Sequence, residues 1–123
     1  MQELPKILIV DDDETNLRFL HEVLSEKYQI QSVSTGEEAL QFINSFNPNI
    51  LLLDIMLPGI DGYEVCQKIR KDEKHSEVRI ILISAKAMAD DKQKGYDMGG
   101  DAYITKPFDH LDLFAIIDKI LVD

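Results

Sequence analysis

The sequence is short of cysteine, of long apolar runs and of basic residues, and each shortage excludes a class of protein. Its one cysteine, Cys66, has no partner within the chain, so no internal disulfide is possible. No stretch of about 18 apolar residues occurs, so no segment is expected to span a membrane. The first residues lack the basic-then-apolar pattern of a signal peptide. We therefore expect a cytoplasmic protein that does not act at a membrane.

Basic residues are also outnumbered, since 13 Lys and Arg stand against 23 Asp and Glu and the formal net charge is -10. Binding to nucleic-acid phosphates requires a basic patch, so we expect no direct nucleic-acid partner. The 123 residues fit one domain, residues 1–123, and 45% apolar content is ordinary for a globular core. No repeat, linker or low-complexity tract divides the chain.

Five short apolar runs alternate with amphipathic segments. Runs of this length that end in turn or polar residues are typical of buried strands, and we predict strands at 6–10, 29–33, 50–54, 79–84 and 101–105. The 29–33 run alternates apolar and polar residues, which favours a position at or near an edge. Strand-helix alternation repeated five times predicts an α/β fold, with a parallel sheet covered by helices on both faces.

Capping residues mark where several helices begin. Asp13, Asp61 and Asp109 are suited to the N-cap position, and Thr35 with Glu38 has the spacing of a capping box. The segment 85–98 is predicted as a weak helix. Its apolar stripe is limited to Met88, Tyr96 and Met98, and Gly95 inside it costs about 1 kcal/mol relative to Ala. Cys66 and the three histidines lack metal-ligand spacing and are interpreted as structural or surface groups.

Polar residues follow four of the predicted strands. In a doubly wound sheet the first and third strands are neighbours at a switch point, so Asp11 and Asp12 are expected beside Asp54. Three crowded carboxylates repel one another unless a cation joins them, and oxygen ligands suit Mg²⁺. An Asp carboxylate can accept a phosphoryl group, whose charge Lys106 and the Ser84 hydroxyl would stabilise. The pattern predicts a magnesium-dependent phosphoryl acceptor at Asp54.

Four segments resemble the receiver (CheY-like) domains of two-component response regulators, and the resemblance covers essentially the whole chain. The segments are Ile-Leu-Ile-Val-Asp-Asp-Asp (7–13), Leu-Leu-Leu-Asp-Ile-Met-Leu-Pro-Gly-Ile-Asp-Gly (51–62), Ile-Leu-Ile-Ser-Ala (81–85) and Asp-Ala-Tyr-Ile-Thr-Lys-Pro-Phe (101–108). All four in this order, each at a predicted strand end, make the resemblance specific. It implies a flavodoxin-like, doubly wound sheet of five parallel strands in the order 2-1-3-4-5, flanked by five helices.

The resemblance also implies a role for each matching residue. Asp54 would be the phosphoacceptor, and Lys106 would pair with the phosphate. Mg²⁺ would be held by Asp11, Asp12 and Asp54, with the backbone carbonyl of Met56 as a further ligand.

A second group of residues would carry the switch. Ser84, where the family often has Thr, would bond a phosphate oxygen, and Tyr103 would rotate inward as Ser84 moves. By its pattern alone Tyr103 is equally well explained as strand packing. Ser84 alone is better explained as a helix cap, and only its alignment with Asp54 and Lys106 reverses that order. The bond between Lys106 and Pro107 would be cis. Met56 and Lys86 flank the phosphate position, where the family varies, and leave open the lifetime of the phosphorylated state.

The implied function is a phosphorylation switch. A sensor histidine kinase or phosphotransfer protein would donate the phosphoryl group, and the domain would catalyse only its own phosphorylation and dephosphorylation. The surface formed by the helix 85–98, the strand 101–105 and the last helix would then change its affinity for a downstream effector. The cognate kinase, the effector, dimerisation on phosphorylation of an otherwise monomeric chain, and membership in a longer regulator or hybrid kinase stay open.

Two alternatives belong to other functional classes. A degenerate receiver would act only as an interaction module, which the complete set of acidic, hydroxyl and lysine residues disfavours. A magnesium-dependent phosphatase of the haloacid dehalogenase kind also uses an Asp nucleophile after a strand. Such enzymes need a general-acid Asp two residues further on, where this chain has Met56.

Overall fold

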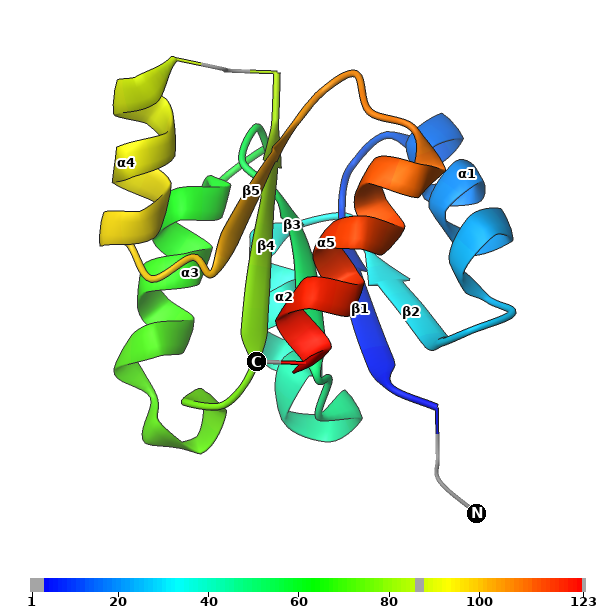
Figure 1. The fold of residues 1–123 in the computed structure, drawn as a ribbon. Helices are drawn as coiled ribbons and strands as arrows, with labels where there is room; N and C mark the ends of the chain where they lie inside the picture. The colour runs from blue at the N-terminus through cyan, green and yellow to red at the C-terminus, as the bar shows by residue number, and fades with distance from the viewer. Residues whose placement is uncertain (1–3, 86–87, 123) are drawn as a thin grey trace.

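Five strands form one parallel sheet in the computed structural model, which describes residues 4–85 and 88–122 (Figure 1). The order across the sheet is β2-β1-β3-β4-β5, and every neighbouring pair is parallel. The strands are β1 (Lys6–Val10), β2 (Gln29–Val33), β3 (Ile50–Asp54), β4 (Arg79–Ser84) and β5 (Ala102–Thr105). The predicted doubly wound, flavodoxin-like α/β fold is confirmed, and β2 lies at an edge as its alternation predicts.

Helices cover both faces of this sheet (Figure 1). Side chains of α1 and α5 pack on one face, and those of α2 and α3 pack on the other. The helices are α1 (Glu14–Leu24), α2 (Gly36–Phe46), α3 (Gly62–Lys71), α4 (Ala89–Asp97) and α5 (His110–Val122), with a short 3-10 helix η1 (Glu73–His75) before β4. Among the described residues, no helix has the length and apolarity needed to cross a bilayer.

The central strands are apolar on both faces because helices cover both. Successive residues alternate between the two cores, as a strand period of two requires. The core under α2 and α3 takes Leu8, Val10, Leu51, Leu53, Ile80, Leu82 and Tyr103. The core under α1 and α5 takes Ile7, Ile9, Ile50, Leu52, Ile81, Ile83 and Ile104. This burial holds the carboxyl ends of the strands in a fixed register.

The predicted caps are present at four helix starts. Asp13, Thr35, Asp61 and Asp109 each accept a hydrogen bond from a backbone N–H two or three residues further on, at 2.9 to 3.1 Å. Each bond satisfies one of the N–H groups that a helix leaves without an internal partner. The caps also set where the loops after β1, β3 and β5 end.

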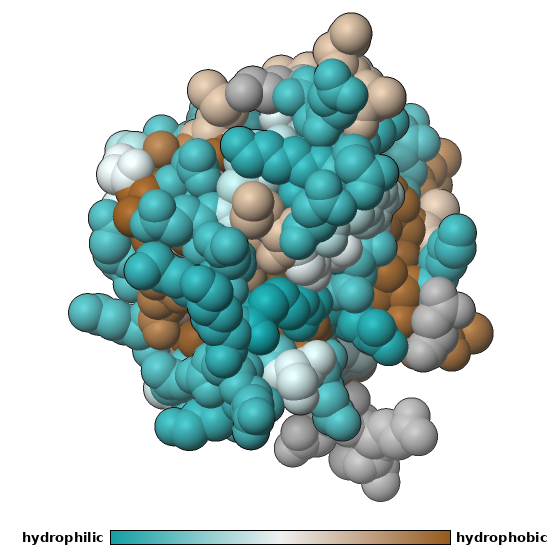
Figure 2. Space-filling model, turned by 90° about the vertical axis from the view of Figure 1, so that its left-hand side faces the viewer, coloured by the Kyte–Doolittle hydropathy of each residue, from teal (hydrophilic) through white to brown (hydrophobic). Residues whose placement is uncertain are grey.

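The helix expected over 85–98 is shorter than predicted. It spans Ala89–Asp97, and residues 86 and 87 lie outside the described part of the chain. The predicted apolar stripe is wrong for Met88 and Tyr96, which are 72% and 48% exposed, although Met98 packs against the core. Figure 2 shows that the face presented by α3 and α4 is mostly hydrophilic.

Gly95 explains how so polar a helix packs against the sheet. It is the one buried residue among those described in α4. A Cβ at this position would lie 2.8 Å from Leu82 Cδ1, which is closer than real Cβ contacts, and 3.1 Å from Tyr103 Cδ2, which is tighter than most of them. The glycine therefore permits close approach of α4 to β4 and β5. Gly95 lowers the helix propensity of α4, but it is also what allows the helix to pack on the sheet.

Candidate functional site

Three carboxylates meet at the carboxyl edge of the sheet. Because β1 pairs with β3 and Val10 is opposite Leu53, the residues that follow Val10 lie beside Asp54. Carboxylate oxygens of Asp11, Asp12 and Asp54 all lie within 4.8 Å of one another. Asp11 and Asp54 are 1% and 4% exposed, whereas Asp12 faces solvent. The structure thus brings together the three acids that sequence reasoning selected.

The Asp54 carboxylate is held at both oxygens. Lys106 Nζ donates to Oδ2 at 2.8 Å, and the backbone N–H of Met56 donates to Oδ1 at 2.9 Å. Burial raises the pKa of Asp54, an effect that the hydrogen bonds from Lys106 and Met56 only partly offset and that the charge of Asp11 reinforces. Burial therefore disfavours the charged form of Asp54, and additional positive charge nearby would stabilise it.

The partner of Asp54, Lys106, also has a shifted pKa. Burial alone would lower its pKa, but its hydrogen bond and ion pair with Asp54 and the charges of Asp11 and Asp13 outweigh burial. The net result is a raised pKa, so the ammonium is firmly protonated at neutral pH. Its peptide bond to Pro107 is cis.

Asp11 has two partners that orient it. The backbone N–H of Asp13 donates to Oδ1 at 2.9 Å, and the side-chain amide of Asn16 donates to Oδ2. Sequence reasoning missed Asn16. Its position in the first turn of α1, five residues after Asp11, is the feature that could have indicated it, since that turn begins directly beside the strand end.

The other predicted site residues lie on β4 and β5. Ser84, fully buried, ends β4 one residue beyond the partner of Asp54, and its carbonyl accepts from the Lys106 N–H at 2.8 Å. Tyr103 is buried opposite Leu82. The Met56 side chain is exposed, while its backbone adjoins Asp54. Lys86 lies outside the described residues.

Gly62 is a further residue that sequence reasoning did not assign to the site. A Cβ there would lie 2.5 Å from the backbone oxygen of Asp54 and 2.7 Å from the Cα of Ile55. Both contacts are to backbone, which cannot move aside cheaply. Glycine at the start of α3 therefore allows the helix to begin against the end of β3.

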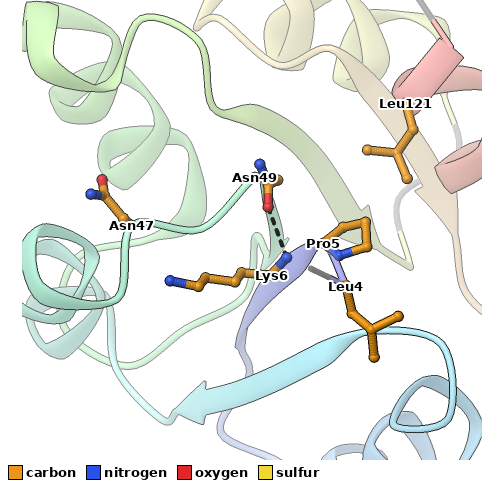
Figure 3. A pocket seen from close by; sticks show the side chains of 6 residues that line it. All are labelled: Leu4, Pro5, Lys6, Asn47, Asn49 and Leu121. Atoms are coloured by element: carbon orange, nitrogen blue, oxygen red, sulfur yellow. Dashed lines mark hydrogen bonds between the residues drawn. The ribbon is translucent and has the colours of Figure 1, made fainter. Parts of the chain in front are cut away.

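Figure 3 shows a different pocket, at the opposite end of the sheet, where β1 and β3 begin. It is lined by Leu4, Pro5, Lys6, Asn47, Asn49 and Leu121. The backbone N–H of Lys6 donates to Asn49 Oδ1 at 2.8 Å, which joins the starts of the two strands. Among the described residues, the lining has no carboxylate, hydroxyl or thiol, so this pocket lacks a carboxylate that could accept a phosphoryl group.

The family model of the response regulator receiver domain matches residues 7–118 of this chain. The chain belongs to this family. It is a receiver domain of two-component response regulators. Receiver domains interact with histidine kinases, and the receiver domain itself is not a classic enzyme. The match favours this function over the haloacid dehalogenase hypothesis.

Similar proteins support the assignment. The receiver is 41% identical over 117 residues to a protein of Porphyridium aerugineum named as a probable transcriptional regulator, ycf27, covering 94% of this chain and 48% of that one. It is 34% identical to RpaA of Synechocystis, a protein named as a DNA-binding dual master transcriptional regulator, covering 96% of this chain and 49% of that one. The chain spans about half the length of these curated relatives. The expectation of no nucleic-acid partner therefore applies only to residues 1–123.

A solved structure also supports the assignment to the receiver family. The beryllofluoride-activated receiver domain of DrrB, a Thermotoga maritima protein, has a TM-score of 0.87 and 32% identity to this receiver. The alignment covers 98% of this chain and 99% of that one.

Proposed function

We propose that Asp54 accepts a phosphoryl group from a phosphohistidine on a sensor histidine kinase or phosphotransfer protein. The observation that carries this proposal is the setting of the Asp54 carboxylate. It is nearly buried, lies within 4.8 Å of two other carboxylates and is 2.8 Å from a lysine ammonium. Such a setting combines a nucleophilic oxygen with groups able to stabilise transferred negative charge.

Asp11, Asp12 and Asp54 are proposed to hold Mg²⁺, with the Met56 carbonyl as a further ligand. The donor set fits, because Mg²⁺ prefers carboxylate and carbonyl oxygens and no thiolate or imidazole belongs to this cluster. When bound, the ion supplies positive charge both to the carboxylates and to the phosphoryl oxygens.

In the proposed transfer, an Asp54 carboxylate oxygen attacks phosphorus. The phosphorus–nitrogen bond of the phosphohistidine breaks, and its electron pair returns to the imidazole. Lys106, already 2.8 Å from Asp54 Oδ2, stabilises the phosphoryl oxygens as they approach. Hydrolysis of the acyl phosphate later restores Asp54, so that the domain catalyses only its own phosphorylation and dephosphorylation.

The switch is proposed to run through Ser84 and Tyr103. The Ser84 hydroxyl would donate to a phosphoryl oxygen, and the inward orientation of Tyr103 would accompany the phosphorylated state. The surface of α4, β5 and α5 would then bind a downstream effector with altered affinity. Support comes from Tyr103 itself, which lies on β5 and contacts α4 at Gly95.

Three further features complete the proposal. We propose that residues 1–123 form a single receiver domain, that it is cytoplasmic, and that it is monomeric before phosphorylation. Dimerisation on phosphorylation is left open.

Intact-mass measurement tests the acceptor. Wild type, Asp54→Ala and the exposed N-cap control Asp61→Asn are incubated with Mg²⁺ and a small-molecule acyl phosphate, with and without chelator. We expect one phosphoryl increment on wild type and on Asp61→Asn, and none on Asp54→Ala or with chelator. An increment on Asp54→Ala equal to that of wild type contradicts the assignment of Asp54. Absence of any increment, combined with absence of beryllofluoride binding, favours the interaction-module alternative.

A further inference from the structure

The last turn of α3 reaches the C-terminal end of α4 through Arg70. Arg70 Nε donates to the carbonyl of Gly99 at 2.8 Å, in the turn that connects α4 to β5. Arg70 Nη1 donates to the carbonyl of Val78 at 2.7 Å, and Nη2 donates to the carboxylate of Asp101. One guanidinium therefore joins α3, the residue before β4 and the turn between α4 and β5.

Asp101 extends this contact into the sheet. Its carboxylate also accepts from the backbone N–H of Ile80 at 2.8 Å, and its own backbone N–H donates to the Ile80 carbonyl at 2.8 Å. Gly99 permits the arginine to approach. Its φ of 108° lies in the region that favours glycine, and a Cβ there would lie 2.3 Å from Arg70 Cγ. The stem of Arg70 thus occupies space that only a glycine leaves open.

The N-terminal end of α4 is held more weakly. Its N-cap residue, Met88, forms no side-chain capping bond among the described residues, whereas the four other helices have such caps. The first turn is tied to α3 by a hydrogen bond of 3.1 Å from the Tyr63 hydroxyl to the Asp91 carbonyl. This end also follows β4 in the chain, and Ser84 ends that strand beside the acceptor site.

We propose that Arg70 is a positioning residue that pins the C-terminal end of α4, so that α4 pivots about this end when Asp54 is phosphorylated. The inference rests on the proposed function, in which phosphorylation alters the surface that includes α4. A change at Ser84 reaches α4 first through its weakly held N-terminal end. Because the other end is bonded to α3 and to β4, the first turn of α4 moves while the last turn stays in place.

Hydrogen exchange at backbone amides measures both ends of α4 in one sample. The N–H groups of residues 98–100 each donate to a carbonyl of α4 at 3.0 Å, and those of Asp91 and Lys92 donate to the Met88 carbonyl at 3.1 and 3.2 Å. All five amides must therefore open before they exchange. In wild type, after correction for intrinsic exchange rates, we expect slower exchange at residues 98–100. Mg²⁺ with beryllofluoride should change exchange at Asp91 and Lys92 and leave residues 98–100 within twofold.

The variant Arg70→Met removes the guanidinium and keeps an aliphatic stem against Gly99. The Arg70 side chain is only 22% exposed, so water cannot readily replace its bonds. We expect exchange at residues 98–100 to accelerate about 12- to 160-fold, the range that corresponds to one hydrogen bond from a charged group. The response to Mg²⁺ and beryllofluoride should now extend to residues 98–100. A general loss of stability would accelerate exchange equally with and without these additions.

A second variant and a control accompany this one. Arg70→Lys keeps the charge, but one ammonium nitrogen cannot occupy the positions of three guanidinium nitrogens, so a smaller change in the same direction is expected. Arg18→Met removes the same charge from an exposed position on α1 and should leave exchange at both ends of α4 unchanged. Circular dichroism establishes which variants are folded.

Wild-type exchange at residues 98–100 in the folded Arg70 variants overturns the inference. A wild-type response to beryllofluoride that is as large at residues 98–100 as at Asp91 and Lys92 also overturns it. Failure of wild type to bind beryllofluoride instead overturns the proposed function, because the comparison of variants without additions requires neither Mg²⁺ nor the acceptor.

Discussion

Asn16 offers the sharpest test of how the acidic site is supported. The Asn16 amide donates to Asp11 Oδ2, and the other Asp11 oxygen accepts from the Asp13 N–H at 2.9 Å. Asp11 is 1% exposed, so water cannot readily replace a lost donor. Replacing Asn16 with Ala removes one of these two donors and leaves every proposed metal ligand in place.

The Asn16→Ala substitution should change two quantities, the free energy of unfolding and the affinity for Mg²⁺. A hydrogen bond to a charged group contributes about 1.5–3 kcal/mol, so the free energy of unfolding should fall by that amount. Residues that orient a metal ligand typically change metal affinity about 10- to 100-fold. Because the Asp13 N–H still fixes one oxygen of Asp11, we expect the lower end, a Kd for Mg²⁺ raised about tenfold, or about 1.4 kcal/mol.

Calorimetric titration of folded protein with Mg²⁺ measures the affinity, and urea unfolding without Mg²⁺ measures the stability. The control is Asn44→Ala, which removes a side-chain contact of 2.9 Å to the buried His75 ring, far from the acidic site. That variant should lose stability and keep the wild-type Kd. A Kd for Asn16→Ala within twofold of wild type refutes an orienting role.

Two further predictions concern the packing around the site. Gly62→Ala places a Cβ 2.5 Å from the Asp54 carbonyl oxygen, so it should lower the free energy of unfolding by about 1–3 kcal/mol in urea titrations, and wild-type stability would contradict the close contact. Burial raises the pKa of the Cys66 thiol to about 11, so little thiolate exists at pH 8 and a thiol reagent should react slowly. The Cys66 thiol keeps its proton to a higher pH in the folded state than in the unfolded state. The free energy of unfolding should therefore fall as the pH rises from about 9 to about 11. Reaction of native protein as fast as urea-unfolded protein would show that Cys66 is not enclosed.

The sheet and the acidic cluster could be predicted because both follow from local pattern. Apolar runs ending in Asp11 and Asp54 identify buried strands, and the topology of a doubly wound sheet then brings their ends together. The packing role of Gly95 was not predicted, because helix propensity says nothing of the neighbouring sheet. Asn16 was missed for a related reason. It acts through Asp11, across the turn between β1 and α1, and periodicity does not encode such a pair.

The charges at the site explain why a divalent cation, in particular, is expected there. Three carboxylates, from Asp11, Asp12 and Asp54, lie together with one ammonium, from Lys106, so the cluster carries 3 − 1 = 2 net negative charges. Lys106 hydrogen-bonds to Asp54 at 2.8 Å, and the charge of Asp11 adds to the rise in the Asp54 pKa that burial chiefly causes. A second lysine would neutralise only one charge and would occupy the space that the phosphoryl group needs. One Mg²⁺ would balance both charges and could also bind phosphoryl oxygens, so the excess negative charge of these three carboxylates favours binding of a divalent cation.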